Sequence, residues 1–276
     1  MNKPDTPLPI VPAPEPIDPA LAPLLSLVDT APALPAADAL RARLLGRLAA
    51  SRAAAQAMVT RRIARSAPLA LADGVQAVTL YEHDAGARLR PGEPLRARLI
   101  ELAPGAAWAG PGPGVHREWL VLRGRVTLGE ATLGERDYHV DPAPAATARL
   151  ASAEGARVFL RESDAPAGPG DAPFTVHDAQ AGWPEFAPGI RRRVLWQRDG
   201  QAALLYLAQP GASVPLHDHG HDEECLMVRG ELFLDDLLLR EGDYQLAPAG
   251  TGHRITETDT GVVIYAHGDL DLRFRS

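Results

Sequence analysis

The chain repeats itself at a fixed offset of 106 residues. Residues 104–155 align without a gap on residues 210–261. The identical pairs include Gly105 with Gly211, Glu118 with Glu224, Gly124 with Gly230, Asp137 with Asp243, Tyr138 with Tyr244 and Pro142 with Pro248. Self-similarity at a fixed period is typical of chains built from repeated structural units. The sequence therefore predicts two similar domains in tandem.

Both copies have the pattern of a β-domain. From about residue 67 the apolar runs are short and are bounded by glycine and proline, as in EWLVLRG, AALLYLA and GVVIYAH. Short, evenly spaced strands favour a double-sheet jelly roll for each copy. We expect an all-β protein with one barrel over residues 67–163, a linker over residues 164–173 and a second barrel over residues 174–276.

Two different segments precede the barrels. Residues 1–36 contain ten prolines, which fix φ and remove backbone donors, so we expect an extended or disordered tail there. Residues 37–66 combine leucines at helical spacing with seven arginines, and Asp38 stands at a suitable N-cap position. This pattern predicts one amphipathic helix, which either packs on the barrels through its leucines or binds a partner protein.

Charge and composition exclude several classes of protein. The net charge is −7, whereas nucleic-acid binding requires a cationic surface. The single cysteine, Cys225, excludes a disulfide framework and a multi-cysteine zinc module. No apolar run approaches the ~18 residues of a membrane helix, and the N-terminus lacks the pattern of a secretory signal. We therefore expect a cytoplasmic protein without a nucleic-acid or membrane partner.

The second copy carries a group of potential metal ligands. His217 and His219 are two residues apart and would face the same side of a strand, with Glu223 shortly after them. His253 follows in a motif of its own, 36 residues after His217. The two patterns are G-x5-H-x-H-x3-E-x6-G and G-x5-P-x-G-x2-H. Three imidazoles and one carboxylate suit a divalent cation and leave one or two positions for water or substrate, whereas the alternative is a solvated polar loop.

These patterns resemble the two motifs of the cupin superfamily. The resemblance implies two tandem cupin jelly-roll barrels, the second holding one divalent metal on four residues. These residues are His217, His219, Glu223 and His253. Zinc is the expected metal, and iron, manganese and nickel are the alternatives.

Finer details, H-x-H-x3-E-E followed by L-x-V-x-G and G-D-Y, look like the cupin domain of ChrR-type anti-sigma factors. That family also has an N-terminal zinc module with a His-x3-Cys-x2-Cys motif. This chain has no histidine before His83 and no cysteine before Cys225. Zinc-dependent capture of a sigma factor therefore cannot be transferred to this chain from the resemblance.

Four further residues are candidates for contact with the metal ligands: His221, Glu224, Cys225 and Met227. Strand alternation would point Cys225 and Met227 inward with Glu223. The thiol of Cys225 is then either a small buried apolar group or an oxidisable sensor. Glu224 or His221 could supply a proton-transfer group, and His267 is expected at the surface.

The first copy has lost every ligand. At the same offset, the ligand positions are occupied by Pro111, Pro113, Arg117 and Thr147. We expect a metal-free barrel in which Trp119 fills the vacant space. Arg117 inside a barrel would need a carboxylate partner or a bound anion, and its neighbour Glu118 would face outward.

Two functions follow from these features. In the first, the metal-loaded barrel has a ChrR-like sensory or regulatory role, and the N-terminal helix meets a sigma factor or another regulatory protein. In the second, the chain is a quercetinase-like, metal-dependent dioxygenase that acts on a small organic substrate in the second barrel. The sequence leaves the metal, the signal and the substrate open, and it also leaves open whether the chain forms a homodimer.

Overall fold

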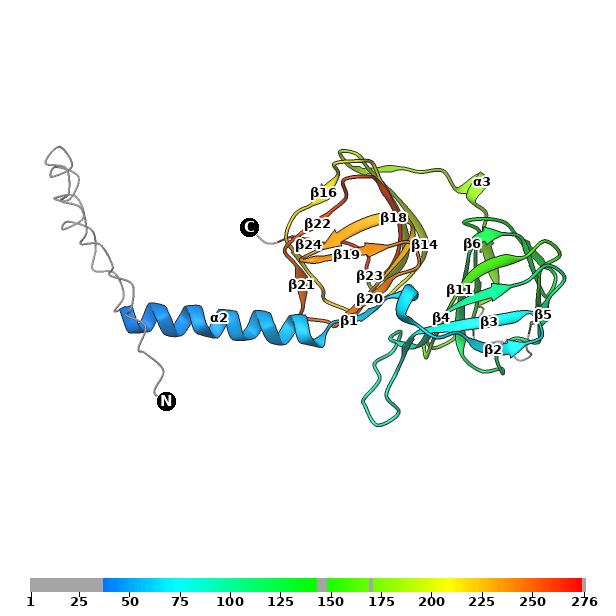
Figure 1. Cartoon of the computed structure of the whole chain (residues 1–276), viewed down its shortest axis with the longest axis horizontal. Helices are drawn as coiled ribbons and strands as arrows, with labels where there is room; N and C mark the ends of the chain where they lie inside the picture. Colours follow the sequence, from blue (N-terminus) through cyan, green and yellow to red (C-terminus); the bar gives the residue numbers. More distant parts are fainter. Residues whose placement is uncertain (1–36, 143–147, 169–170, 275–276) are drawn as a thin grey trace, which may run out of the picture. The chain divides into compact units, whose positions relative to one another are not determined.

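The computed structural model describes residues 37–142, 148–168 and 171–274 (Figure 1). The proline-rich tail and Thr147 lie outside these residues. The chain divides into two compact units, Met1–Arg52 and Ala53–Ser276. No helix within the described ranges is long and apolar enough to cross a membrane. The second unit is built almost entirely of antiparallel strands, which confirms the predicted all-β class.

The helix α2 (Ala37–Ala57) is shorter than the sequence suggested. It ends at Ala57 and not at residue 66, because β-branched Val59 and Thr60 form the strand β1 (Val59–Arg61) on the second barrel. A 3-10 turn, η2 (Ile63–Arg65), follows. The side chain of Asp38 lies outside the described side chains. Four leucines of α2 are exposed: Leu40, Leu44, Leu45 and Leu48.

The first barrel consists of two sheets. Among the described residues, the larger sheet has the order β12 (Phe174–Val176), β9 (Tyr138–Asp141), β6 (His116–Gly124), β11 (Ala156–Ser163), β4 (Pro94–Leu102), β3 (Val75–Glu82) and β2 (Leu69–Ala72). The smaller sheet has the order β5 (Ala107–Trp108), β10 (Leu150–Ala151), β7 (Val126–Leu128) and β8 (Ala131–Leu133).

The second barrel repeats this arrangement. Its main sheet has the order β1, β20 (Tyr244–Ala247), β18 (Glu223–Leu234), β23 (Val262–Asp269), β15 (Gln201–Ala208), β14 (Ile190–Arg198) and β13 (Glu185–Ala187). The strands β16 (Ser213–Val214), β19 (Leu237–Arg240) and β22 (Thr256–Glu257) join it. A small sheet contains β21 (Gly252–His253), β17 (His217–Asp218) and β24 (Arg273–Phe274).

The two barrels exchange edge strands. β1 precedes the first barrel in sequence but pairs with β20 of the second, and β12 precedes the second barrel but pairs with β9 of the first. The receiving strands are equivalent, since Tyr138 of β9 and Tyr244 of β20 are 106 residues apart. Residues 174–176 therefore belong to the first barrel, and the expected boundary at residue 174 is wrong. The exchange links both barrels within one compact unit.

Three apolar clusters account for the packing of this unit. One fills the first barrel and includes Trp119 and Val158. A second fills the second barrel and includes Met227 and Leu239. The third contains residues of both barrels, such as Phe159 and Tyr265, whose ring centroids are 5.0 Å apart. Because strand residues alternate between faces, each barrel presents one face to its own core and another to its neighbour.

Candidate metal centre

Short strands bring the predicted ligands together at one end of the second barrel. His217 on β17 lies opposite His253 on β21 in the antiparallel register. Glu223 begins β18, and His219 lies in the loop between β17 and β18. All four side chains are buried, with between 1% and 9% of each residue exposed.

Potential ligand atoms of three of these residues form a close group, and His253 lies beside it. Atoms of His217, His219 and Glu223 that could bind a metal lie within 4.8 Å of one another. Nε2 of His219 lies 2.9 Å from Oε2 of Glu223, and Nε2 of His253 lies 4.0 Å from the same oxygen. The structure thus groups His217, His219 and Glu223 and places His253 next to Glu223.

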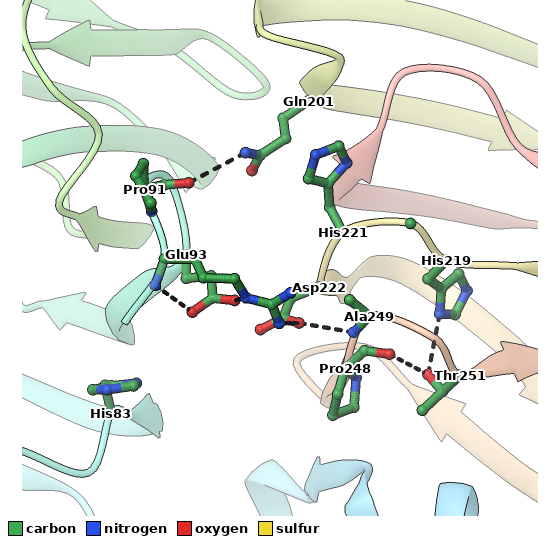
Figure 2. A network of polar contacts seen from close by, with 12 residues as sticks. His83, Pro91, Glu93, Gln201, His219, His221, Asp222, Pro248, Ala249 and Thr251 are labelled. Carbon is green, nitrogen blue, oxygen red and sulfur yellow. Dashed lines mark hydrogen bonds and ion pairs between the residues drawn. The ribbon is translucent and has the colours of Figure 1, made fainter. Parts of the chain in front are cut away.

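Each imidazole is oriented through its other ring nitrogen. Nδ1 of His217 lies 3.0 Å from the carbonyl oxygen of Pro215, and Nδ1 of His253 lies 3.3 Å from Oδ2 of Asp235. Nδ1 of His219 lies 3.4 Å from Oγ1 of Thr251, whose hydroxyl donates to the carbonyl of Pro248 (Figure 2). Such contacts fix the ring and leave Nε2 directed to the centre, as in many metal-binding histidines.

The site also has the electrostatics of a cation site. Burial alone would raise the pKa of Glu223, but the imidazoles of His219, His217 and His253 lower it to about 2. The carboxylate is therefore ionised although it is buried. Nε2 of His219 is buried and faces Oε2 of Glu223 at 2.9 Å. A buried carboxylate that faces buried imidazole nitrogens fits a divalent cation that these groups would bind together.

Small residues surround Glu223 and leave it space. Ala202 pairs with Gly268, Glu223 pairs with Ala247, and a Cβ on Gly268 would lie 3.2–3.3 Å from backbone and side-chain atoms of Glu223. These four residues form a row of neighbours across adjacent strands. The row at the equivalent positions of the first barrel, 106 residues earlier, contains Arg96, Glu162, Arg117 and Asp141.

This row contains the partner that Arg117, as a buried cation, was expected to need. Arg117 Nε lies 3.5 Å from Glu162, which also pairs with Arg96 at 3.4 Å, so its partner is a carboxylate. The first barrel therefore has four side chains of alternating charge where the second has one acid and three small residues. Trp119 lies in the core of the first barrel, as expected.

A cavity of about 60 Å³ adjoins the ligands. His217, Glu223 and His253 form part of its wall, together with Cys225. The rest of the wall includes side chains of β15, β18 and β23, most of them apolar. A metal held by the four ligands would therefore have one side open to an apolar space.

The four additional candidates separate into different environments. Cys225 lines the cavity, but burial raises the pKa of its thiol well above the usual value. Met227 lies in the apolar core of the same barrel and is not part of the cavity wall. His221 pairs with Asp269 at 2.5 Å, beside Gln201 (Figure 2).

Glu224 and His267 belong to a buried network between the barrels. Arg161 of the first barrel contacts Glu224, and it donates to Glu118 at 2.9 Å and to the carbonyl of Gly92 at 2.6 Å. His267 lies 3.4 Å from Glu118 and is 1% exposed. The expectations that His267 is at the surface and that Glu224 contacts the metal ligands are therefore wrong.

Tyrosines complete this network. Tyr244 donates to Glu224 at 2.7 Å, and Tyr138 donates to Glu118 at 2.6 Å. The repeat pairs Glu118 with Glu224 and Tyr138 with Tyr244. Glu118 does lie on the face opposite Arg117, but the second barrel covers that face. One feature of the sequence could have indicated this network: the same glutamate and the same tyrosine occur in both copies, and strand alternation places the glutamates outside the barrel interior.

Comparison with known proteins agrees with this geometry. The family model described as the ChrR cupin-like domain matches residues 171–271. The second barrel is therefore similar to the ChrR cupin-like domain. No curated protein matches the sequence.

Solved structures extend the likeness to the two-barrel cupin fold. A Nostoc punctiforme protein named as a candidate dioxygenase has a TM-score of 0.58 and 16% identity, over 77% of this chain and 80% of its own. A Pseudomonas aeruginosa protein named as a candidate glyoxylate-induced protein has a TM-score of 0.58 and 15% identity, over 79% and 86%. An oxalate decarboxylase variant from Bacillus subtilis has a TM-score of 0.58 and 16% identity, over 79% and 78%. Another structure of that decarboxylase is described as having Mn(II) centres.

Proposed function

We propose that this chain is a divalent-metal-binding cupin with a ChrR-like sensory or regulatory role. The observation that carries the proposal is the meeting of three imidazoles and one carboxylate beside a mainly apolar cavity, whose wall includes His217, Glu223 and His253. The metal would be held by His217, His219, Glu223 and His253. Bound there, it would supply a Lewis acid that polarises an oxygen of a small molecule in the cavity.

Zinc remains the first expectation for the metal, and iron, manganese and nickel remain alternatives, because affinity for this donor set depends on geometry and on metal availability. A cytoplasmic location belongs to the same proposal. Elemental analysis of protein purified without added metal would identify the ion.

The connection between the cupin and the helix supports a regulatory role. β1 follows α2 directly and lies on β20 of the metal-binding barrel. Arg62 donates to Asp243 at 2.8 Å, and the backbone N–H of Ile63 donates to the same carboxylate at 3.0 Å. A change in the second barrel could therefore reach the segment that ends α2. The partner of that helix would be a sigma factor or another regulatory protein.

Pull-down with a candidate sigma factor tests this role. The matched control is a chain that lacks residues 1–57, because a deletion through residue 66 would also remove β1 and η2. We expect the intact chain to retain the sigma factor and the shortened chain to lose it. Equal recovery by both would contradict a role for the helix.

A dioxygenase is the second candidate, and the cavity beside the ligands favours it. Its test is oxygen consumption by iron-, manganese- and nickel-loaded protein with flavonols, diketones and small acids. Uptake that disappears in His219→Ala would favour the enzyme over the sensor. Absence of uptake with all three metals would favour the sensor.

A further inference from the structure

Apart from His217, Glu223 and His253, the wall of the cavity beside the metal ligands is mainly apolar. Val214, Leu232, Leu234, Ile264 and Leu272 form much of it. Within the described part of the chain, no lysine or arginine is among the residues that line it. A negative charge placed against this wall would lose its hydration and gain no partner.

The arginine that approaches the cavity from outside is already engaged. Arg192 lies near the hydroxyl of Tyr206, which lines the cavity. Its guanidinium donates to the carbonyl of Leu270 at 2.7 Å and lies 4.4 Å from the centre of the Phe186 ring. These contacts keep the positive charge of Arg192 outside the cavity wall.

The charge of the centre itself sets the second limit. A divalent ion with the carboxylate of Glu223 and neutral imidazoles carries one net positive charge. One negative charge on an incoming molecule would be balanced there. A second negative charge placed against the apolar wall would have no counter-charge there, which is unfavourable.

One polar atom in the wall has no partner. Oγ1 of Thr256 is buried and makes no hydrogen bond, and Thr256 lines the cavity. The neighbouring wall residue Thr258 differs, because its hydroxyl donates to the carbonyl of Glu231 at 2.7 Å. Buried hydroxyl groups are usually satisfied, so the hydroxyl of Thr256 is available to a bound molecule.

The volume sets the size of that molecule. A cavity of about 60 Å³ is smaller than the ~150 Å³ cavity that holds benzene. The space therefore suits a molecule of about six non-hydrogen atoms or fewer.

We propose that the cavity binds a small molecule with one metal-binding oxygen-donor end, at most one negative charge and an otherwise uncharged, mainly apolar body. Short-chain monocarboxylates belong to this class, and dicarboxylates are rejected. This inference rests on the proposed function, because the oxygen-donor end binds the metal.

Butyrate and oxalate provide a matched pair of probes, since each has six non-hydrogen atoms and they differ in charge. Both are titrated into cobalt-loaded full-length protein, and the visible absorption of Co(II) reports a new ligand. We expect the Kd of butyrate to be at least tenfold lower than that of oxalate. Equal or tighter binding of oxalate with cobalt retained, or no binding of either, would overturn the inference and leave the metal site intact. Failure to retain cobalt would overturn the proposed function and this inference together.

A second variant tests the charge argument independently. Ser213 is exposed and lines the cavity, so Ser213→Arg adds a positive charge at a position that tolerates it. We expect this change to strengthen oxalate binding relative to butyrate by at least threefold. An unchanged ratio, with cobalt retained, would contradict the charge argument.

Discussion

A few residue differences separate a metal centre from a charged cluster at equivalent positions of the two barrels. Glu223 is surrounded by Ala202, Gly268 and Ala247, which leave space for an ion. At the corresponding positions of the first barrel, arginines and acids alternate and neutralise one another. The loss of metal ligands there is therefore matched by a change in the whole surrounding row.

Gly268 is the residue of this row whose substitution should disturb Glu223 most. A Cβ there would lie 3.2 Å from Cα and 3.3 Å from Cγ of Glu223. We expect Gly268→Ala to displace the carboxylate and to weaken metal binding about tenfold, as changes beside metal ligands commonly do. Competition with a chromogenic chelator measures the affinity.

Gly134→Ala is the matched control, because an added Cβ there meets Asp137 Oδ2 only at 3.8 Å, an ordinary contact. Equal metal affinity of both variants and the unsubstituted protein would show that the space beside Glu223 is not needed.

The sequence indicated the four candidate ligands because each occupies a position in a spaced motif. It did not predict the surroundings of Glu224 and His267. Strand alternation places them away from the barrel interior, but alternation cannot indicate what covers the outer face. The 106-residue repeat suggested two barrels without showing that their outer faces meet.

At the scale of elements, the metal site depends on contact between two loops. Asp222, in the loop between β17 and β18, accepts a hydrogen bond at 2.8 Å from the backbone N–H of Ala249 (Figure 2). The turn that contains Ala249 also holds Thr251, the partner of His219. Asp222 thus fixes the loop that orients one ligand. Arg90 of the first barrel lies 3.5 Å from the same carboxylate.

We expect Asp222→Ala to lower metal affinity by about tenfold, because the turn that orients His219 loses an anchor. Arg90→Ala is the control. Arg90 is largely exposed, and exposed ion pairs contribute only ~0–1 kcal/mol. The metal affinity of Arg90→Ala should therefore differ less than twofold from that of the unsubstituted protein. Chelator competition on both variants checks this, and equal losses would indicate that the contact with the first barrel matters as much as the turn.

Two element boundaries differ from those that the sequence predicted. The leucine and arginine pattern predicted a helix through residue 66, yet Val59–Arg61 pair with Leu246, Gln245 and Tyr244. Similarly, Phe174–Val176 pair with a strand of the first barrel. The paired residues are 187 positions apart in one case (Val59 and Leu246) and 34 in the other (Phe174 and Val140). Neither pairing leaves a pattern within its own segment, so neither exchange could be predicted from periodicity.

At the scale of the whole molecule, buried charges hold the barrels in one arrangement. Arg161 contacts Glu118 and Glu224 at the contact between the barrels, and all three are at most 1% exposed. Burial alone would raise the pKa of Glu118, but His267, Arg161 and His116 hold it well below the usual value of 4.5. The ionised form of Glu118 therefore stabilises the folded state.

This contribution makes stability depend on pH. Because the pKa of Glu118 is lower in the folded than in the unfolded chain, its contribution is complete above pH 4.5 and is lost as the pH falls below that value. As the pH is lowered from 4.5, we expect the free energy of unfolding to fall more steeply than in Glu118→Gln, by up to about 1.4 kcal/mol per pH unit. Urea unfolding of both proteins across that range measures the slopes. Parallel slopes would contradict an ionised Glu118 in the buried network.

The central claim is that His217, His219, Glu223 and His253 hold one divalent ion, and metal content measured by plasma mass spectrometry tests it most directly. Protein purified without added metal should contain close to one ion per chain, and His219→Ala should contain less than a tenth of that. His221→Ala, in the same loop but paired with Asp269, should keep its metal. A metal-free native protein, or equal metal in the two histidine variants, would contradict the account.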